Sequence, residues 1–172
     1  GRHGNIEKIP SLKYVHRGKV VTNKKAFLNI NDAPLYNLSV KRLNETKKSY
    51  YSESYGLPYE LSRGCPFSCS FCTWRVVNKY QKKDVNKVIR ELKIITKKYN
   101  YNRFKFSDAC FNSNHKYVEE FCDAVIKSEL LIDWSALAIP NFKFRLLSKM
   151  KKAGCRALFY GVETGSPKIN KL

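Results

Sequence analysis

Three cysteines fall within eight residues, at Cys65, Cys69 and Cys72, with the spacing C-x3-C-x2-C. Thiolates are ligands that suit zinc and iron–sulfur clusters. A structural zinc site takes four ligands, usually as two separated pairs, and a 4Fe–4S cluster usually takes four cysteines. Because this stretch supplies only three, its spacing favours a cluster that keeps one iron open for another ligand.

Other interpretations of the trio stay open. One is a simple iron–sulfur electron carrier, which needs a fourth cysteine. Another is a zinc site with Cys110 as its fourth ligand, or a zinc-stabilised module that binds RNA through a basic surface. Cys122 and Cys155 are expected to be small buried side chains, because free cysteine often packs as a hydrophobe. The role of Cys110 is open between a packed thiol and an accessory ligand.

The segments around the cysteines alternate between strand and helix patterns. Three amphipathic helices are expected, the first beginning after Asp84 as its N-cap and the last ending at Gly154. Their apolar stripes are Val85, Val88, Ile89, Leu92, Ile95 and Tyr99; Val118, Phe121, Cys122, Val125 and Ile126; and Phe144, Leu147 and Met150. The expected strands are residues 57–62, 104–107, 132–139 and 157–162.

This alternation predicts an α/β fold with βαβ units on a parallel sheet. The first strand ends at Arg63-Gly64 and leads directly into the cysteines, where parallel α/β folds carry their functional loops. Ser166 and Pro167 have the pattern of a helix start. Because few residues follow them, we expect the chain to be a fragment of a larger barrel or sheet.

The composition sets broader limits. The chain has 172 residues and a formal net charge of +19, but its basic residues are mostly lysine, 24 against 9 arginines. A diffuse lysine excess is weak support for nucleic-acid binding, because arginine is the residue that grips phosphates and reads bases. No apolar run approaches the roughly 20 residues of a membrane-spanning helix. Six unevenly spaced cysteines do not form a disulfide framework, and a reducing compartment is expected.

The cysteine spacing, with Phe71 directly before the last cysteine, resembles the hallmark of the radical S-adenosylmethionine (radical SAM) enzymes. That family has a full or partial (βα) barrel with this loop after the first strand, and residues 55–172 fit its first four βα units. The resemblance implies that Cys65, Cys69 and Cys72 bind three irons of a 4Fe–4S cluster and that SAM chelates the fourth. One electron would then cleave SAM to methionine and a 5′-deoxyadenosyl radical, which abstracts a hydrogen atom from an unknown substrate.

The same resemblance implies which residues contact SAM. Phe71 would lie against the adenine, mainly through its backbone. Asp108 lies in residues 106–111, which resemble an acidic turn of the family, and would contact the SAM amino group. Glu163 and Ser166 follow the fourth strand, in a stretch that resembles the G-x-E-S/T turn whose polar side chains face SAM. No residue is singled out as the catalytic group that acts on the substrate.

Structural roles compete with several of these assignments. Asp108 could cap a turn. Arg63 and Arg75 flank the cysteines and could tune a cluster's potential or be solvated. Trp74 and Trp134 are expected to pack rather than to stack on substrate. The histidines, which show no metal-binding spacing, are His3, His16 and His115.

We therefore expect residues 51–172 to form the N-terminal half of a radical SAM core. Residues 1–50, with a hairpin at 12–22, would be a connector or the tail of an upstream domain. This part is loosely similar to the join between a cobalamin-binding domain and a radical SAM core, so cobalamin held by an upstream domain is a candidate cofactor, although the D-x-H-x-x-G motif is absent. The resemblance also implies an external electron donor of the flavodoxin or ferredoxin kind. A cytoplasmic location without a membrane partner is expected, and RNA is a candidate partner that the sequence does not specifically indicate.

Overall fold

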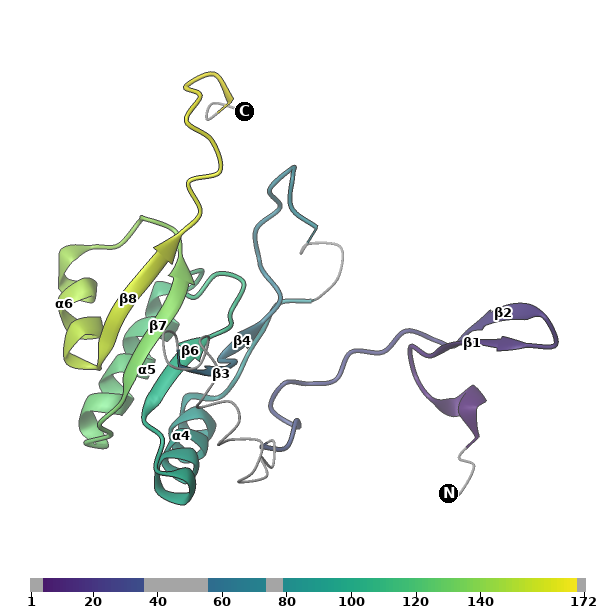
Figure 1. Ribbon diagram of the computed structural model, residues 1–172, viewed down its shortest axis with the longest axis horizontal. Helices are drawn as coiled ribbons and strands as arrows, with labels where there is room; N and C mark the ends of the chain where they lie inside the picture. The colour runs from purple at the N-terminus through teal and green to yellow at the C-terminus, as the bar shows by residue number, and fades with distance from the viewer. Residues whose placement is uncertain (1–4, 36–55, 74–78, 170–172) are drawn as a thin grey trace.

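The computed structural model describes residues 5–35, 56–73 and 79–169. Its main sheet has four parallel strands in the order β3-β6-β7-β8, with helices between them along the chain (Figure 1). The bounds are β3 Leu57–Tyr59, α4 Val85–Tyr99, β6 Arg103–Phe106, α5 His115–Lys127, β7 Asp133–Ala138, α6 Phe144–Lys152 and β8 Cys155–Tyr160. The predicted α/β class, with four parallel strands, is confirmed.

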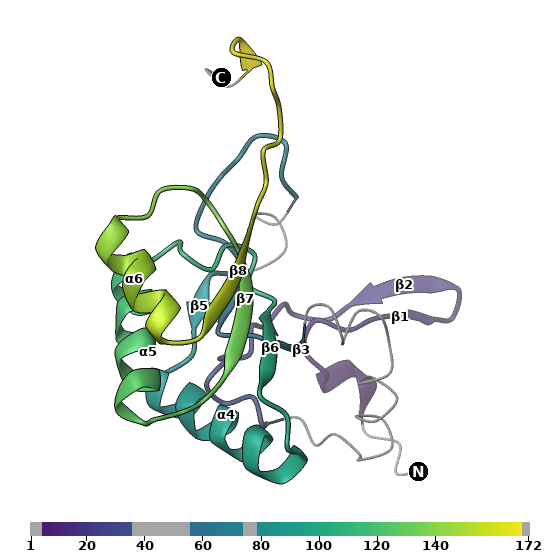
Figure 2. The same ribbon diagram turned by 60° about the vertical axis from the view of Figure 1, so that its left-hand side comes forward.

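The three helices cover one face of this sheet (Figures 1 and 2). Side chains alternate along each strand, so that Phe104 and Phe106 are buried under the helices while Arg103 is exposed. Trp134 stacks on Phe106 with ring centroids 5.1 Å apart, and its Nε1 donates to the carbonyl of Ala153 at 2.8 Å. The expectation that Trp134 serves packing is confirmed.

The helix boundaries follow local signals in the sequence. The side chain of Asp84 accepts from the backbone N–H of Lys87 at 3.1 Å, which begins α4. The side chain of Asn114 accepts from Tyr117 N at 3.0 Å and begins α5. Beyond the end of α6, Gly154 has a φ of +92°, a conformation that glycine adopts without strain.

The predicted strand over residues 57–62 is wrong as one element. β3 ends at Tyr59, and the chain then turns into a separate two-residue strand, β4 (Ser62–Arg63), which pairs antiparallel with β5 (Gln81–Lys82). The break occurs because the backbone N–H groups of Leu61 and Ser62 bond to the side chain of Asp108 instead of to a neighbouring strand.

Two apolar stripes also differ from the prediction. Phe144, at the start of α6, is 84% exposed, whereas Leu146 and Met150 are buried. The buried face of α6 is centred on that pair, four residues apart, so Phe144 points away from the sheet. On α5, Ile126 was expected to be buried but is exposed, whereas Tyr117, which was not part of the predicted stripe, is buried.

The N-terminal part contains a 3₁₀ turn, η1 (Ile6–Lys8), and a hairpin of β1 (Lys13–His16) and β2 (Lys19–Thr22). Arg17 and Gly18 both have positive φ, which is the two-residue turn that hairpins favour, so the predicted hairpin is confirmed. Ile30 is fully buried, and its backbone N–H donates to the side chain of Gln81 at 3.1 Å. No helix in the described part of the chain is long and apolar enough to cross a membrane.

Candidate functional site

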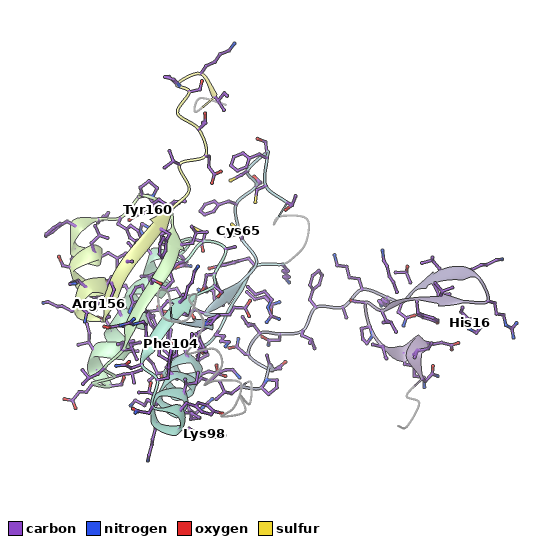
Figure 3. The ribbon with its side chains drawn as sticks, in the orientation of Figure 1. His16, Cys65, Lys98, Phe104, Arg156 and Tyr160 are labelled. Atoms are coloured by element: carbon purple, nitrogen blue, oxygen red, sulfur yellow. The ribbon has the colours of Figure 1, made fainter. Side chains whose placement is uncertain are left out.

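The three clustered cysteines lie on the cysteine loop, residues 64–80 between β4 and β5, of which 64–73, 79 and 80 are described. This loop projects from the edge at which the parallel strands end (Figures 1 and 2). Cys69 is exposed, and Cys65 and Cys72 are half-buried (Figure 3 labels Cys65). The backbone N–H of Cys72 donates to the carbonyl of Cys69 at 3.1 Å, so these two cysteines share a tight turn.

The donor chemistry of the cysteine loop fits an iron–sulfur cluster. Three thiols lie within one accessible segment at the predicted end of the sheet. Among the residues that the structure describes, no three cysteine, histidine or acidic side chains are gathered at metal-binding distance.

Asp108 lies at the base of the cysteine loop rather than at its tip. It follows β6, is 3% exposed, and accepts hydrogen bonds from Leu61 N, Ser62 N and Ser62 Oγ. Burial raises the pKa of Asp108 to about 6, although the hydrogen bonds from Ser62 and Leu61 act against the rise. The contacts seen here are with the protein itself, and the contact with SAM stays a prediction.

The segment that follows β6 also holds the other end of the cysteine loop. Ser113 Oγ donates to Tyr80 Oη at 3.0 Å. Asn112 is 1% exposed; its Nδ2 donates to the carbonyl of Ile139 at 2.8 Å and to Asn141 Oδ1 at 2.6 Å. Residues 107–114 thus connect the cysteine loop to the end of β7.

The remaining cysteines differ in their surroundings. Cys110 is buried in residues 107–114, and its Sγ lies 3.5 Å from Asn112 Oδ1. Burial raises the pKa of the Cys110 thiol, and the nearby Cys65 adds to the increase. Cys122 is fully buried, with its pKa raised by burial to about 12, and half-buried Cys155 has a pKa raised to about 11 for the same reason. The prediction that Cys122 packs in the core is confirmed.

Glu163 and Ser166 lie on the segment after β8, which leaves the same end of the sheet as the cysteine loop (Figures 1 and 2). Glu163 is exposed with a φ of +59°, and its side chain folds back over Gly161, where an added Cβ would come within 2.2 Å of Oε1. Ser166 Oγ accepts from the backbone N–H of Ile169 at 3.5 Å. This bond is the one expected of an N-cap, and the helix predicted after Pro167 stays a prediction, because its further residues lie outside the described part of the chain.

The other residues proposed near the cysteines are placed as follows. Phe71, on the cysteine loop, is 69% exposed. Arg63 makes a bidentate contact with Glu60, the closest atoms being 2.7 Å apart, so its charge is already paired. Trp74 and Arg75 lie outside the described residues. His115 Nε2 lies 3.1 Å from Asn141 Oδ1, and its ring stacks on Phe142.

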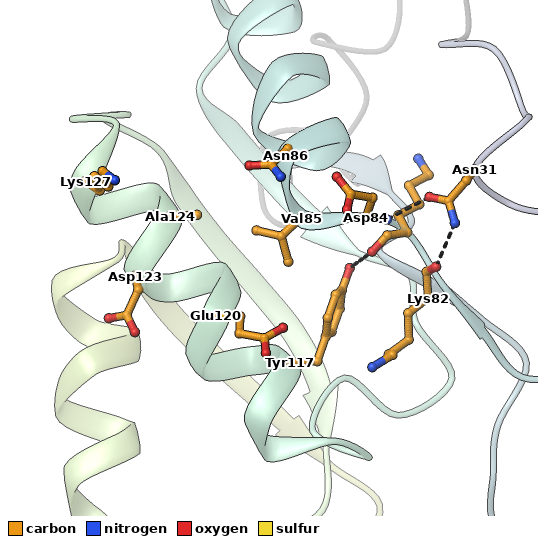
Figure 4. A pocket seen from close by; sticks show the side chains of 11 residues that line it. Asn31, Lys82, Asp84, Val85, Asn86, Tyr117, Glu120, Asp123, Ala124 and Lys127 are labelled. Carbon is orange, nitrogen blue, oxygen red and sulfur yellow. Dashed lines mark hydrogen bonds between the residues drawn. The ribbon is translucent and has the colours of Figure 1, made fainter.

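A hollow of about 710 Å³ lies away from the cysteines, between α4 and α5 (Figure 4). Asn31 crosses its rim, donating from Nδ2 to the carbonyl of Lys82 and accepting from Asp84 N. Tyr117 Oη donates to the carbonyl of Lys83 at 2.8 Å. Lysine, aspartate and glutamate side chains all line this hollow, so its charge does not favour either an anionic or a cationic ligand. The hydrogen bonds of Asn31 fix the N-terminal segment on the core.

Sequence reasoning missed three residues of this region: Ser62, Tyr80 and Asn112. None belongs to a recognisable motif, and each becomes visible only through a partner that is 29 or more residues away in the chain. The signal that existed was the polar composition of residues 107–114, directly after a buried strand.

Comparison with known proteins adds a family and a fold. The sequence model of the radical SAM superfamily matches residues 59–172. An uncharacterised methyltransferase of Pyrococcus horikoshii is 27% identical over 172 residues, which cover 95% of this chain and 36% of that protein. The anaerobic magnesium-protoporphyrin IX monomethyl ester cyclase of Rubrivivax gelatinosus is 31% identical over 110 residues, covering 62% of this chain and 20% of the cyclase.

Among solved structures, the radical S-adenosylmethionine methyltransferase TsrM of Kitasatospora setae, with cobalamin and a 4Fe–4S cluster bound, has the same fold over 69% of this chain and 24% of its own. The TM-score is 0.62 and the sequence identity 18%. The chain therefore spans little more than a third of the length of the Pyrococcus horikoshii methyltransferase and about a quarter of the solved structure.

Proposed function

The chain belongs to the radical SAM superfamily, and from this membership we propose that it forms the cluster-binding part of a radical SAM enzyme of the methyltransferase or cyclase type. The observation that carries the proposal is the position of Cys65, Cys69 and Cys72. They lie at the C-x3-C-x2-C spacing on an accessible loop, in the segment that connects β3, the first strand of the parallel sheet, to α4.

In this proposal the thiolates of Cys65, Cys69 and Cys72 would hold a 4Fe–4S cluster, which would keep one iron open for SAM. Once an external donor had reduced it, the cluster would supply one electron for the cleavage of SAM to methionine and a 5′-deoxyadenosyl radical. The chain contributes position and access: the cysteine loop is open to solvent, so SAM and an external electron donor can approach it. We propose a donor of the flavodoxin or ferredoxin kind and a cytoplasmic location, where thiols stay reduced.

We propose that SAM lies between the cysteine loop and the segment after β8. Phe71 would contact the adenine, and Glu163 and Ser166 would offer polar groups from the same end of the sheet. Asp108 was predicted to contact the SAM amino group. Because both of its oxygens already accept hydrogen bonds from Leu61 or Ser62, a contact with SAM would have to share or replace those bonds.

Residues 1–50 are proposed to be a connector that leads from an upstream cobalamin-binding domain to the core at 51–172. The support is indirect: the solved structure that shares its fold with 69% of this chain has cobalamin bound. Ile30 and Asn31 attach this connector to β5 and to the start of α4.

The proposal is tested by reconstituting the protein anaerobically with iron and sulfide and recording the EPR spectrum of the reduced cluster with and without SAM. We expect a 4Fe–4S signal that shifts when SAM is added. Cys69→Ala should lose the signal, and Cys155→Ala, which removes a thiol outside the cysteine loop, should keep it.

Each other result points to a different protein. A 4Fe–4S signal that SAM leaves unchanged would favour the electron carrier. Zinc in elemental analysis, with no cluster, would favour the zinc-stabilised module, for which a steep salt dependence of RNA binding is expected.

A further inference from the structure

We propose that Asp108 is a positioning residue, which fixes the start of the cysteine loop by holding Ser62 and thereby sets where Cys65 lies. This inference rests on the proposed function, since it assigns a role in holding the cluster that the cysteine loop would bind. It differs from the role predicted from the sequence, in which Asp108 contacts SAM.

The contacts of Asp108 converge on one short stretch of chain. Oδ1 accepts from both the backbone N–H and the hydroxyl of Ser62, and Oδ2 accepts from the backbone N–H of Leu61 at 3.3 Å. Asp108 and Ser62 are 3% and 4% exposed. Ser62 is followed by only two residues before Cys65, so the carboxylate acts at the point where the cysteine loop leaves the sheet.

The rest of the base is too small to hold the cysteine loop alone. β4 and β5 are two residues long each and, within the described part of the chain, form a two-stranded sheet of their own; an isolated two-stranded ladder is marginal in water. The backbone N–H of Lys83 donates to the carbonyl of Leu61 at 2.8 Å, and Ser113 holds Tyr80 near the other end of the loop. Of the bonds at the base of the cysteine loop, those to Asp108 are made to a buried carboxylate. Hydrogen bonds to an ionised carboxylate are stronger than those between neutral groups, so the bonds to Asp108 contribute most to holding the base.

The arrangement requires a group that only accepts hydrogen bonds. Three donors point at the two oxygens of Asp108, and an ionised carboxylate meets them without a donor of its own. In Asp108→Asn, an NH2 group replaces one of the two oxygens. This hydrogen-bond donor would then face the backbone N–H of Leu61 or Ser62, which is also a donor. Without this anchor, the backbone before Cys65 would have to be ordered when the cluster binds, and the lost conformational entropy would weaken cluster binding.

The test compares variants of the reconstituted protein before any SAM is added. Ser62→Ala removes one donor to Asp108 and leaves every cysteine in place, and Asp108→Asn disturbs the whole set. For both we expect iron release to a chelator that is about tenfold faster than in the unmodified protein, because each loses a hydrogen bond to a charged group. The EPR signal of the reduced cluster should also change shape.

Two further variants separate positioning from general destabilisation. Ser62→Thr keeps the hydroxyl and should restore slow iron release, which a variant that merely loosens the fold would not do. Ser107→Ala changes an exposed serine next to Asp108 and should match the unmodified protein. If Asp108→Asn does not fold, Ser62→Ala and Ser62→Thr still decide the question.

The inference is overturned if Ser62→Ala and Asp108→Asn keep the iron-release rate and EPR signal of the unmodified protein, and Asp108→Asn loses only the shift caused by SAM. That result would assign Asp108 to SAM and leave the proposed function intact. Failure of the unmodified protein to assemble a 4Fe–4S cluster would be a different result, since it would refute the proposed function itself.

Discussion

The hydroxyl of Tyr59, on β3, donates a hydrogen bond of 2.6 Å to Oε2 of Glu91, on α4. The same oxygen accepts from Lys83 Nζ at 3.0 Å, and Lys87 Nζ lies 3.2 Å from Oε1. Glu91 is 4% exposed. Burial opposes ionisation of Glu91, but the hydrogen bonds from Tyr59 and Lys83 outweigh it, and the pKa of Glu91 is lowered. The hydrogen bond from Tyr59 thus joins the first strand of the sheet to the first helix, and a buried ion pair between Glu91 and Lys83 lies beside it.

Removing Glu91 should therefore destabilise the fold more than removing Tyr59's hydroxyl. We expect Glu91→Ala to lower the free energy of unfolding by about 3 kcal/mol, because Lys83 is left buried without its partner. Tyr59→Phe should lower it by about 1 kcal/mol, the value of one hydrogen bond. Urea denaturation measures both, with Glu119→Ala as the control: Glu119 pairs with Lys149 but its side chain is 44% exposed. Equal effects of Glu91→Ala and Glu119→Ala would contradict the importance of burial.

The raised pKa of Asp108 predicts a dependence of stability on pH. The ordinary value is 3.8 and the folded value is about 6, so the folded state holds this proton more tightly than the unfolded state. The contribution of Asp108 to stability is then fully present below pH 3.8 and is lost as the pH rises through about 6. Over that window the change is up to about 3 kcal/mol.

The measurement is the free energy of unfolding of the cluster-free protein between pH 4 and pH 7, for the unmodified protein and for Asp108→Asn. As the pH falls from 7 to 4, the free energy of unfolding of the unmodified protein should increase relative to that of Asp108→Asn. A difference that stays constant across this range would mean that Asp108 titrates near its ordinary value.

Gly154 should not tolerate a side chain. Its φ is +92°, and an added Cβ would lie 1.9 Å from the carbonyl oxygen of Ile132, which is backbone and cannot move aside cheaply. Gly154→Ala is expected to lower the free energy of unfolding by about 2–4 kcal/mol. Gly165→Ala is the matched control, since a Cβ there meets nothing within 4 Å, and its melting temperature should stay close to that of the unmodified protein.

Cys110 should be dispensable for the cluster. It is buried in residues 107–114, outside the cysteine loop, and its Sγ lies 3.5 Å from Asn112 Oδ1. Cys110→Ala should keep the iron content and the SAM-dependent EPR shift of the unmodified protein. Loss of the cluster in this variant would instead identify Cys110 as the fourth ligand and support the electron carrier or the zinc site.

The parts of the fold that the sequence predicted are those set by local signals. The Asp84 cap and the 3.6-residue period gave α4 its full extent, and the Arg17-Gly18 turn gave the hairpin. The break after Tyr59 could not be predicted, because it depends on Asp108, which lies 46 residues beyond Ser62. Phe144 was placed in the core because its spacing suits a helix, but spacing does not say which side of a helix faces the sheet.

The candidate site divides in the same way. Cys65, Cys69 and Cys72 could be found because their spacing is a property of the sequence itself. Their support could not, since Tyr80 and Ser113 are recognised only once the fold brings them together. A motif thus identifies the groups that do chemistry, and the residues that hold them in place are defined by tertiary contacts.

The strand order β3-β6-β7-β8 has a consequence for how the protein forms. Within this sheet, each strand pairs with the one before it in the chain, so the sheet can grow in the direction of synthesis. The slowest closure should be the first, between Leu57 and Phe104, because it brings together the most distant partners in the sheet. It also brings Asp108 to Ser62. The contact between Asp108 and Ser62 can then form before β7 and β8 are added, whereas residues 107–114 gain their bonds to Leu137, Ile139 and Asn141 only after β7 has been made.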